Sequence, residues 1–182
     1  MYWEQMGPEN TVRTTELAVA RARELGIEHI VVASNTGETA RPLLGKGINV
    51  VVVTHRFGFR EPGRCEMSPE AREELTMAGA KVLTTTHLFS GIERGVTKEF
   101  GGLYIGGIVA ETLRMMGQGT KVAVEVAIMA LDAGLIPYGV DVIAIGGSKR
   151  GADTALVIRP EHSSQFFRSK IREVICKPRD FE

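Results

Sequence analysis

The sequence IEHIVVASNTGETARPLLGKGINVVVV, residues 27–53, decides the fold class of this chain. It holds two apolar runs rich in β-branched residues, at 27–33 and 48–53, and continuous runs of this kind are typical of strands covered on both faces of a parallel sheet. Between them lie a polar loop at 34–40 and a short helical stretch ending near Gly45 and Gly47. The pattern therefore predicts two parallel strands joined over the sheet.

The segments on either side of this stretch continue the alternation of helix and strand. The predicted helices are 11–25, 70–77, 101–116 and 120–131, and the predicted strands beyond the first two are 81–86, 141–145, 154–158 and 171–177, the last at a sheet edge. Ser68 caps the second helix and Pro69 begins it. Strands and helices at these intervals predict one α/β domain over residues 1–182, with a mostly parallel sheet and helices on both faces.

The helix at 120–131 is so apolar that we expect it to be buried on most sides, with only Lys121, Glu125 and Asp132 marking an outer edge. That apolar surface and the pair Met115 and Met116 also leave room for a homo-oligomer. Burial inside one subunit is at least as good an explanation.

Composition excludes several classes of protein. The 22 basic and 22 acidic residues cancel, which argues against a nucleic-acid-binding protein or a membrane-surface protein. No apolar run is long enough to span a bilayer, and no signal peptide is recognisable. Cys65 and Cys176 lack the spacing of a metal site, so we expect no metal and a reducing, cytoplasmic location.

Ligands of open α/β sheets bind outside the carboxyl ends of the strands. This rule directs attention to the loops 34–40, 55–63, 87–95 and 146–153. The sequence contains neither GxxxxGK[ST] nor GxGxxG, so nothing supports P-loop nucleotide hydrolysis or a dinucleotide fingerprint.

The 34–40 loop carries the donors that a phosphate needs. Ser34, Thr36 and Thr39 supply hydroxyls, Asn35 supplies a carboxamide, and Gly37 lets the backbone approach closely. The start of the following helix would add free N–H groups, and Arg41 or Lys46 would add positive charge. From composition alone, an ordinary capped turn between strand and helix explains the loop equally well.

His55 and His87 each follow an apolar strand, so they are expected to converge at the ligand edge, where an imidazole serves as acid, base or hydrogen-bond donor. They are candidate catalytic residues, although ligand contact and a purely structural role are both better supported. Further ligand contacts are expected in the turn with Gly58 and Phe59, and in the loop that opens with Gly146 and Gly147, where a small residue permits close approach; taken singly, these glycine signals are weak.

Two motifs resemble a known family. VVASNTGETARP at 31–42, followed by INVVVVT at 48–54, resembles the start of the C-terminal domain of pyruvate kinase. In that family the loop holds a phosphate of the sugar-bisphosphate activator, which implies phosphate contacts for Ser34, Asn35, Thr36, Gly37 and Thr39. GPENT at 7–11 and HRFGF at 55–59 make the chain more similar still to the stand-alone pyruvate kinase C-terminal-domain-like proteins of archaea and bacteria.

That resemblance implies a three-layer α/β/α domain and a bound flavin mononucleotide (FMN), with its ring across the loops that bear His55, Phe59, His87 and Gly146. A flavin-dependent oxidoreductase would follow. Pyruvate kinase chemistry occurs in a separate barrel domain of ~250 residues, for which this chain has no room. We therefore expect no phosphotransfer to ADP.

Two other functions stay open at this point. One is a regulatory module that senses a sugar phosphate or a nucleotide without catalysis. The other is a hydrolase or isomerase that acts on a phosphorylated metabolite through His55 or His87. Composition and spacing do not distinguish FMN from other phosphorylated small molecules.

Overall fold

The computed structural model describes residues 1–181, which fold around one seven-stranded sheet in the order β1-β7-β6-β5-β2-β3-β4. The strands are β1 Tyr2–Gln5, β2 His29–Ala33, β3 Asn49–Val53, β4 Lys81–Leu83, β5 Val142–Gly146, β6 Thr154–Arg159 and β7 Lys170–Asp180. Strand β6 is antiparallel to both of its neighbours, and all other neighbouring pairs are parallel. The mostly parallel α/β sheet predicted from the sequence is confirmed.

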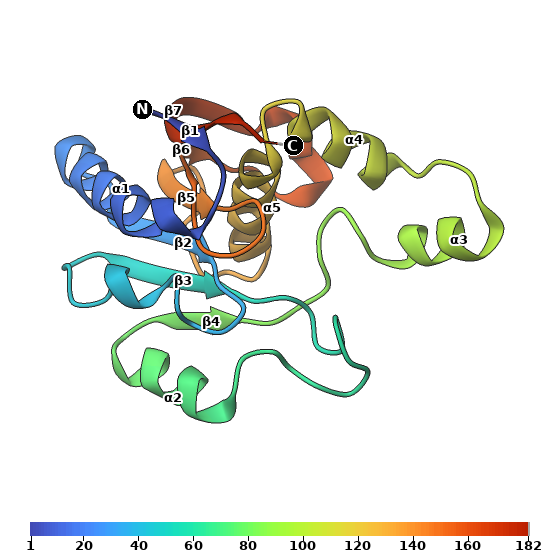
Figure 1. Ribbon diagram of the computed structural model, residues 1–182, viewed down its shortest axis with the longest axis horizontal. Coiled ribbons are helices and arrows are strands. Elements are labelled where there is room, and N and C mark those ends of the chain that lie inside the picture. The colour runs from blue at the N-terminus through green and yellow to red at the C-terminus, as the bar shows by residue number, and fades with distance from the viewer. Residues whose placement is uncertain (182) are drawn as a thin grey trace.

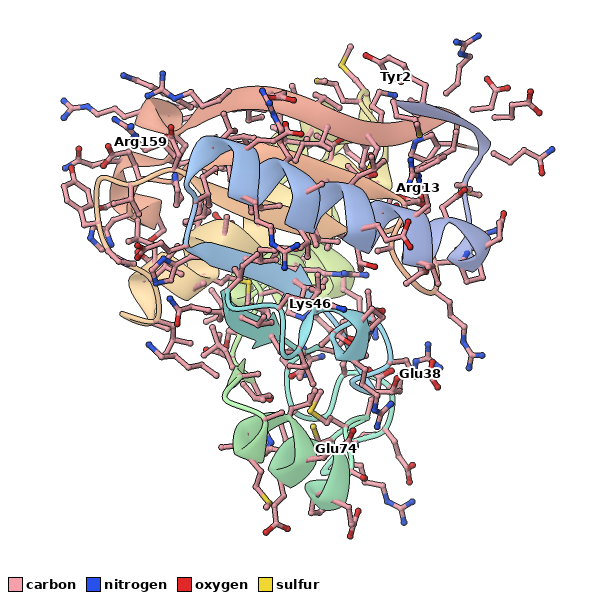
Figure 2. All side chains as sticks on the ribbon, turned by 90° about the vertical axis from the view of Figure 1, so that its left-hand side faces the viewer. Tyr2, Arg13, Glu38, Lys46, Glu74 and Arg159 are labelled. Atoms are coloured by element: carbon pink, nitrogen blue, oxygen red, sulfur yellow. The ribbon has the colours of Figure 1, made fainter. Side chains whose placement is uncertain are left out.

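Helices cover both faces of the sheet (Figure 1). The α-helices are α1 Thr11–Leu25, α2 Pro69–Met77, α3 Ile92–Phe100, α4 Ile105–Arg114 and α5 Gln118–Asp132, and the 3-10 turns are η1 Pro8–Asn10, η2 Arg41–Leu43 and η3 Ser163–Arg168. Figure 2 shows α1 lying across the strands on the face nearer the viewer, while α5 packs on the opposite face, against β5, β6 and β2. The layers are therefore α/β/α.

Alternation along the strands divides the core in two. Ile30 and Val32 of β2 point to the face of α1 and belong to one buried cluster, whereas Val31 points to α5 and belongs to the other. Because both clusters are apolar, the central strands need apolar residues at every position, which explains the unbroken runs in the sequence.

Most predicted elements are present, and two were missed. The predicted helix 11–25 coincides with α1, and Ser68 caps α2 by accepting a hydrogen bond from the N–H of Ala71 at 3.2 Å. Neither the short strand β1 nor α3 was predicted, and the expected helix at 101–116 begins only at Ile105. The assignment of 171–177 to a sheet edge was wrong, because β1 pairs with β7 on its outer side.

The environment predicted for Lys121 and Glu125 was also wrong. Both side chains are buried, and the Lys121 ammonium forms an ion pair with the Glu125 carboxylate. Two opposite charges at i and i+4 are typical of a solvent-exposed helix face, and the sequence prediction followed this pattern. In the folded chain the two charges instead pair with each other in the interior.

Candidate functional site

The carboxyl ends of β2, β3, β4 and β5 open into one cleft of about 400 Å³, which all four loops chosen from the sequence help to line. Helices α4 and α5 supply the rest of the wall. A volume of this order is within the usual range for small-molecule sites, which runs from roughly 300 to 1,000 Å³.

The 34–40 loop turns tightly and leaves its donors free. Gly37 has φ 93° and accepts hydrogen bonds at its carbonyl from the N–H groups of Ala40 and Arg41. A Cβ at Gly37 would lie 3.3 Å from Leu75 of α2, so this glycine also packs the loop closely onto its neighbour. Within residues 1–181 the N–H groups of residues 35–39 donate no hydrogen bond. They remain available to an anion.

Two serine hydroxyls from neighbouring loops add to these free donors. Ser34 Oγ and Ser148 Oγ are both buried, and both lack a hydrogen-bond partner in the part of the chain that the structure describes. Buried polar atoms are nearly always paired, because an unmade hydrogen bond costs about 1–3 kcal/mol. Both serines line the cleft, so a bound ligand is a natural partner for them.

Asp153 fixes the loop that carries Ser148. Its carboxylate accepts hydrogen bonds from the Ser148 N–H at 3.1 Å and from the Thr154 hydroxyl at 2.8 Å. Its backbone carbonyl accepts the indole N–H of Trp3 at 2.7 Å. Gly146 lets the loop lie against α5, since a Cβ there would come within 2.3 Å of the Gly119 carbonyl oxygen.

The charge on the cleft wall favours an anion. Six basic and three acidic side chains line it, which leaves an excess of three positive charges. Arg60 pairs with Glu66 at 2.9 Å, whereas Arg94, Lys149 and Arg150 form no ion pair within residues 1–181.

The basic residues expected beside the 34–40 loop do not contribute positive charge to it. Arg41 forms an ion pair with Glu74 of α2 at 2.9 Å, and Lys46 lies outside the cleft lining. The helix that follows the loop is only the single turn η2, too short to contribute an appreciable dipole. Glu38 is exposed and lies at the periphery of the molecule in Figure 2. Positive charge therefore reaches the cleft from the facing loop, through Lys149 and Arg150.

Three rings form the part of the cleft wall next to the 34–40 loop, which we call the ring wall. The centroid of His55 lies 3.9 Å from that of Phe59 and 5.4 Å from that of His87, and Phe59 and His87 are 5.3 Å apart. The guanidinium of Arg56 lies 5.8 Å from the Phe59 ring centroid. Clustered rings of this kind offer a flat, polarisable surface on which a planar ligand stacks.

Hydrogen bonds fix the proton on His55. Asn35 Oδ1 accepts the His55 backbone N–H at 2.9 Å, which turns the Asn35 amide nitrogen toward His55 Nε2 at 3.1 Å. An amide nitrogen only donates, so Nε2 is the acceptor and Nδ1 carries the proton toward Glu66, 2.5 Å away. The side chain of Asn35 thus joins the 34–40 loop to the ring wall.

His87 is held in a similar way. Its Nε2 accepts the backbone N–H of Arg56 at 3.2 Å. Burial is the main cause that lowers the pKa of His87 to about 4, and the nearby positive groups lower it further while Glu125 opposes them. The ring is therefore neutral at physiological pH. In both histidines the Nε2 lone pair is already occupied, so neither offers a free general base in this geometry.

The floor of the cleft comes from α5. The Glu125 carboxylate accepts the Phe89 N–H at 3.0 Å and pairs with the Lys121 ammonium, which lies 5.4 Å from the Phe89 ring centroid. The pair ties α5 to the segment after His87. Gln118 and Arg114 extend this polar surface, with the Arg114 Nε 2.6 Å from the Gln118 amide oxygen.

The structure brings together most of the residues chosen from the sequence. The cleft is lined by Ser34, Asn35, Thr36, Thr39, His55, Phe59, His87 and Gly147. Gly37, Gly58 and Gly146 are not part of the lining; Gly37 and Gly146 shape the loops behind it. Sequence reasoning missed Lys121, Glu125 and Ser148. A pair of opposite charges embedded in an otherwise apolar helix was the signal that could have revealed the first two.

The fold and the sequence together define the class of protein. The family model of the pyruvate kinase alpha/beta domain matches residues 13–158, and the chain belongs to that family.

Solved structures with a similar fold are pyruvate kinases of Cryptosporidium parvum. One is 18% identical, with a TM-score of 0.44 over 82% of this chain and 22% of that chain. Another, solved in complex with ADP, is 18% identical, with a TM-score of 0.42 over 81% of this chain and 22% of that chain. This chain thus corresponds to about a fifth of their length.

Neither a membrane span nor a metal site is found in residues 1–181. No helix there is long and apolar enough to cross a membrane. No group of three or more histidine, cysteine, aspartate or glutamate side chains is placed there to hold a metal ion.

Proposed function

We propose that this chain binds FMN in the cleft, with the phosphate held by the 34–40 loop and the ring against His55, Phe59 and His87. The observation that carries the proposal is the pair of buried, unpartnered hydroxyls of Ser34 and Ser148 at the cleft wall. They supplement the free N–H groups of residues 35–39.

The residues present fit both ends of the ligand. Hydroxyls, backbone donors and the unpaired Lys149 and Arg150 suit a phosphate dianion. Rings with occupied nitrogens suit stacking on the isoalloxazine. The 34–40 loop packs on α2, whereas Lys121 and Glu125 belong to α5 on the other face of the sheet. The cleft therefore spans the sheet edge and suits an elongated ligand.

A flavin-dependent oxidoreductase is the activity that this ligand would support. FMN, when bound, supplies hydride and single-electron transfer. The residues of the chain bind it, orient it through the Asn35 and His55 contact, and hold the neutral imidazole of His87 beside the ring. Pyruvate kinase activity is not part of the proposal.

Titration with FMN tests the proposal. Stacking against the ring wall is expected to quench flavin fluorescence. The double variant Ser34→Ala/Thr39→Ala should weaken binding by about 100-fold or more, since each lost hydrogen bond to a charged group is worth about 1.5–3 kcal/mol. Thr76→Ala on α2, outside the cleft, is the matched control and should bind as the parent does. Absence of binding by the parent chain would remove the proposal.

The unpaired cations support a second candidate, a regulatory module without catalysis. Arg94, Lys149 and Arg150 would neutralise the second phosphate of a sugar bisphosphate. A ligand that prefers the native state raises the melting temperature. Thermal stabilisation by fructose 1,6-bisphosphate and none by FMN would favour this candidate over the first.

The two cysteines are consistent with a cytoplasmic location, which we include in the proposal. Cys65 and Cys176 are both free thiols. Free thiols persist in reducing compartments. Fractionation of cells that express the protein tests this, and recovery from an oxidising compartment would contradict it.

A further inference from the structure

The helix α3 and the segment that leads into and through α4 expose an apolar surface that no other part of residues 1–181 covers. No residue of α3 is buried. Figure 1 shows α3 projecting at the right-hand side, away from the sheet. Between residues 92 and 108 the apolar side chains exposed by more than half are Ile92, Val96, Phe100, Leu103, Ile105 and Ile108, which we call the α3–α4 surface. Leu103, at 88%, and Ile92, at 85%, are almost completely exposed.

A helix in this environment needs a partner. Helices shorter than about 12 residues are marginal in water unless an apolar face packs against something, and α3 has nine residues. Ile92, Val96 and Phe100 recur every fourth residue and so share one side of the helix. Within the chain the contacts of α3 are slight, such as the 3.4 Å hydrogen bond from the Gly106 N–H to the Glu93 carboxylate.

We propose that the α3–α4 surface is the contact between two copies of this chain. Its extent fits a dimer: at roughly 80 Å² for each side chain, six exposed apolar side chains offer about 500 Å². A stable interface takes about 800 Å² from each partner, of which somewhat more than half is apolar. The two quantities agree.

The charge of α3 also favours a second copy of this chain as the partner. Glu93 and Glu99 balance Arg94 and Lys98, so the helix has no net charge. Membrane-surface helices and nucleic-acid sites carry an excess of Lys and Arg, which α3 lacks. A neutral face can meet its own copy across a twofold axis without net repulsion, as an isologous interface requires.

This dimer would also involve the cleft. Arg94, on α3, and Tyr104, just before α4, both line it. Packing of the apolar side of α3 against a second copy would hold Arg94 at the cleft mouth. The dimer itself does not depend on which ligand binds there.

Sedimentation of the full chain at several concentrations tests the inference. The parent chain is expected to be a dimer, and Ile92→Glu/Phe100→Glu is expected to be a monomer that keeps its core, because neither side chain is buried. Any loss of circular dichroism signal should be limited to the nine residues of α3, which lose their partner. Met77→Glu, at a residue 82% exposed on α2, is the matched control and should remain a dimer.

A disulfide trap gives a second readout that does not depend on a folded charge variant. Gly95→Cys, on α3, has open space around its Cβ position and should form a covalent dimer under mild oxidation. A parent chain that stays monomeric at 100 μM, or a dimer that survives Ile92→Glu/Phe100→Glu, overturns the inference. Binding of the parent chain to phosphatidylglycerol vesicles, lost in that variant, would assign the surface to a membrane instead and would also overturn it.

Discussion

The two walls of the cleft differ in how well their polar groups are satisfied. One wall consists of the 34–40 loop and the loop with Ser148; we call it the phosphate wall, after the group that we propose it binds. Its Ser34 Oγ, Ser148 Oγ and the N–H groups of residues 35–39 have no partner within residues 1–181. In the ring wall, the Nε2 atoms of His55 and His87 each accept a hydrogen bond. The unsatisfied wall is suited to bind polar atoms of a ligand, whereas the satisfied wall is suited to present ring faces.

The difference assigns a separate task to each wall. The unpaired hydrogen-bond donors of the phosphate wall should control the affinity for a phosphate group. The rings of the ring wall should control stacking on the flavin ring and the stability of the protein in acid. Changes in one wall should therefore leave the task of the other largely intact.

The floor that joins the walls should show the largest effect. Glu125→Leu leaves the buried Lys121 ammonium without its partner and frees the Phe89 N–H, so it should lower the free energy of unfolding by about 3–5 kcal/mol. The double variant Lys121→Met/Glu125→Leu should recover much of the loss. Urea denaturation measures both. A Glu125→Leu protein as stable as the parent would mean that the floor does not support the walls.

Charge reversal in the phosphate wall is expected to have the second-largest effect. Lys149→Glu/Arg150→Glu is expected to weaken FMN binding about 100-fold at low salt, with a smaller difference at high salt, because exposed charges are screened. Fluorescence titration at two salt concentrations measures this. Lys170→Glu, at an exposed residue of β7 outside the cleft lining, is the control. Equal affinity of the parent and the double variant would place the phosphate elsewhere.

Acid stability should report on the ring wall. The pKa of His87 is lowered to about 4 in the folded state, below its ordinary 6.5, so the unfolded state binds more protons between these values. Stability contributed by neutral His87 is present above pH 6.5 and is lost as the pH falls toward 4.

His87→Gln keeps an acceptor for the Arg56 N–H but has no proton to gain. It should lose less stability than the parent between pH 6.5 and 4, by about 2 kcal/mol, as the size of the pKa shift implies after allowance for partial exposure. Denaturation at a series of pH values measures the difference. Parallel curves for the two proteins would show that His87 does not titrate as its burial requires.

Loss of one ring should have the smallest effect. Phe59→Ala removes the stacking contact with His55 and His87 and should weaken FMN binding about fivefold, consistent with about 1 kcal/mol for an aromatic pair. It should weaken riboflavin binding by the same factor, since both ligands carry the ring. A loss confined to FMN would mean that Phe59 acts on the phosphate end.

The sequence predicted the phosphate wall better than the floor. Strands β2 and β3 are apolar at every inward position on both faces, so their ends and the loops beyond them were easy to locate. The rule that ligands gather at carboxyl ends then selected the four loops that line the cleft.

What escaped prediction depends on contacts distant in sequence. The strand β1 has only four residues, and its place beside β7 is set by pairing across more than 170 residues. Burial of Lys121 depends on the Phe89 segment, which meets α5 only in the folded chain. Helix α3 has no buried face. The apolar periodicity that normally marks the face of a helix packed on the core therefore did not identify it.

The central claim is that the 34–40 loop binds the phosphate of FMN, and parallel titration with FMN and riboflavin tests it most directly. The two ligands share the ring and differ in the phosphate. We expect FMN to bind at least 100-fold more tightly than riboflavin, since a phosphate held by several charge-assisted hydrogen bonds contributes ~3 kcal/mol or more. Equal affinity for the two ligands, or no affinity for FMN, would contradict the account.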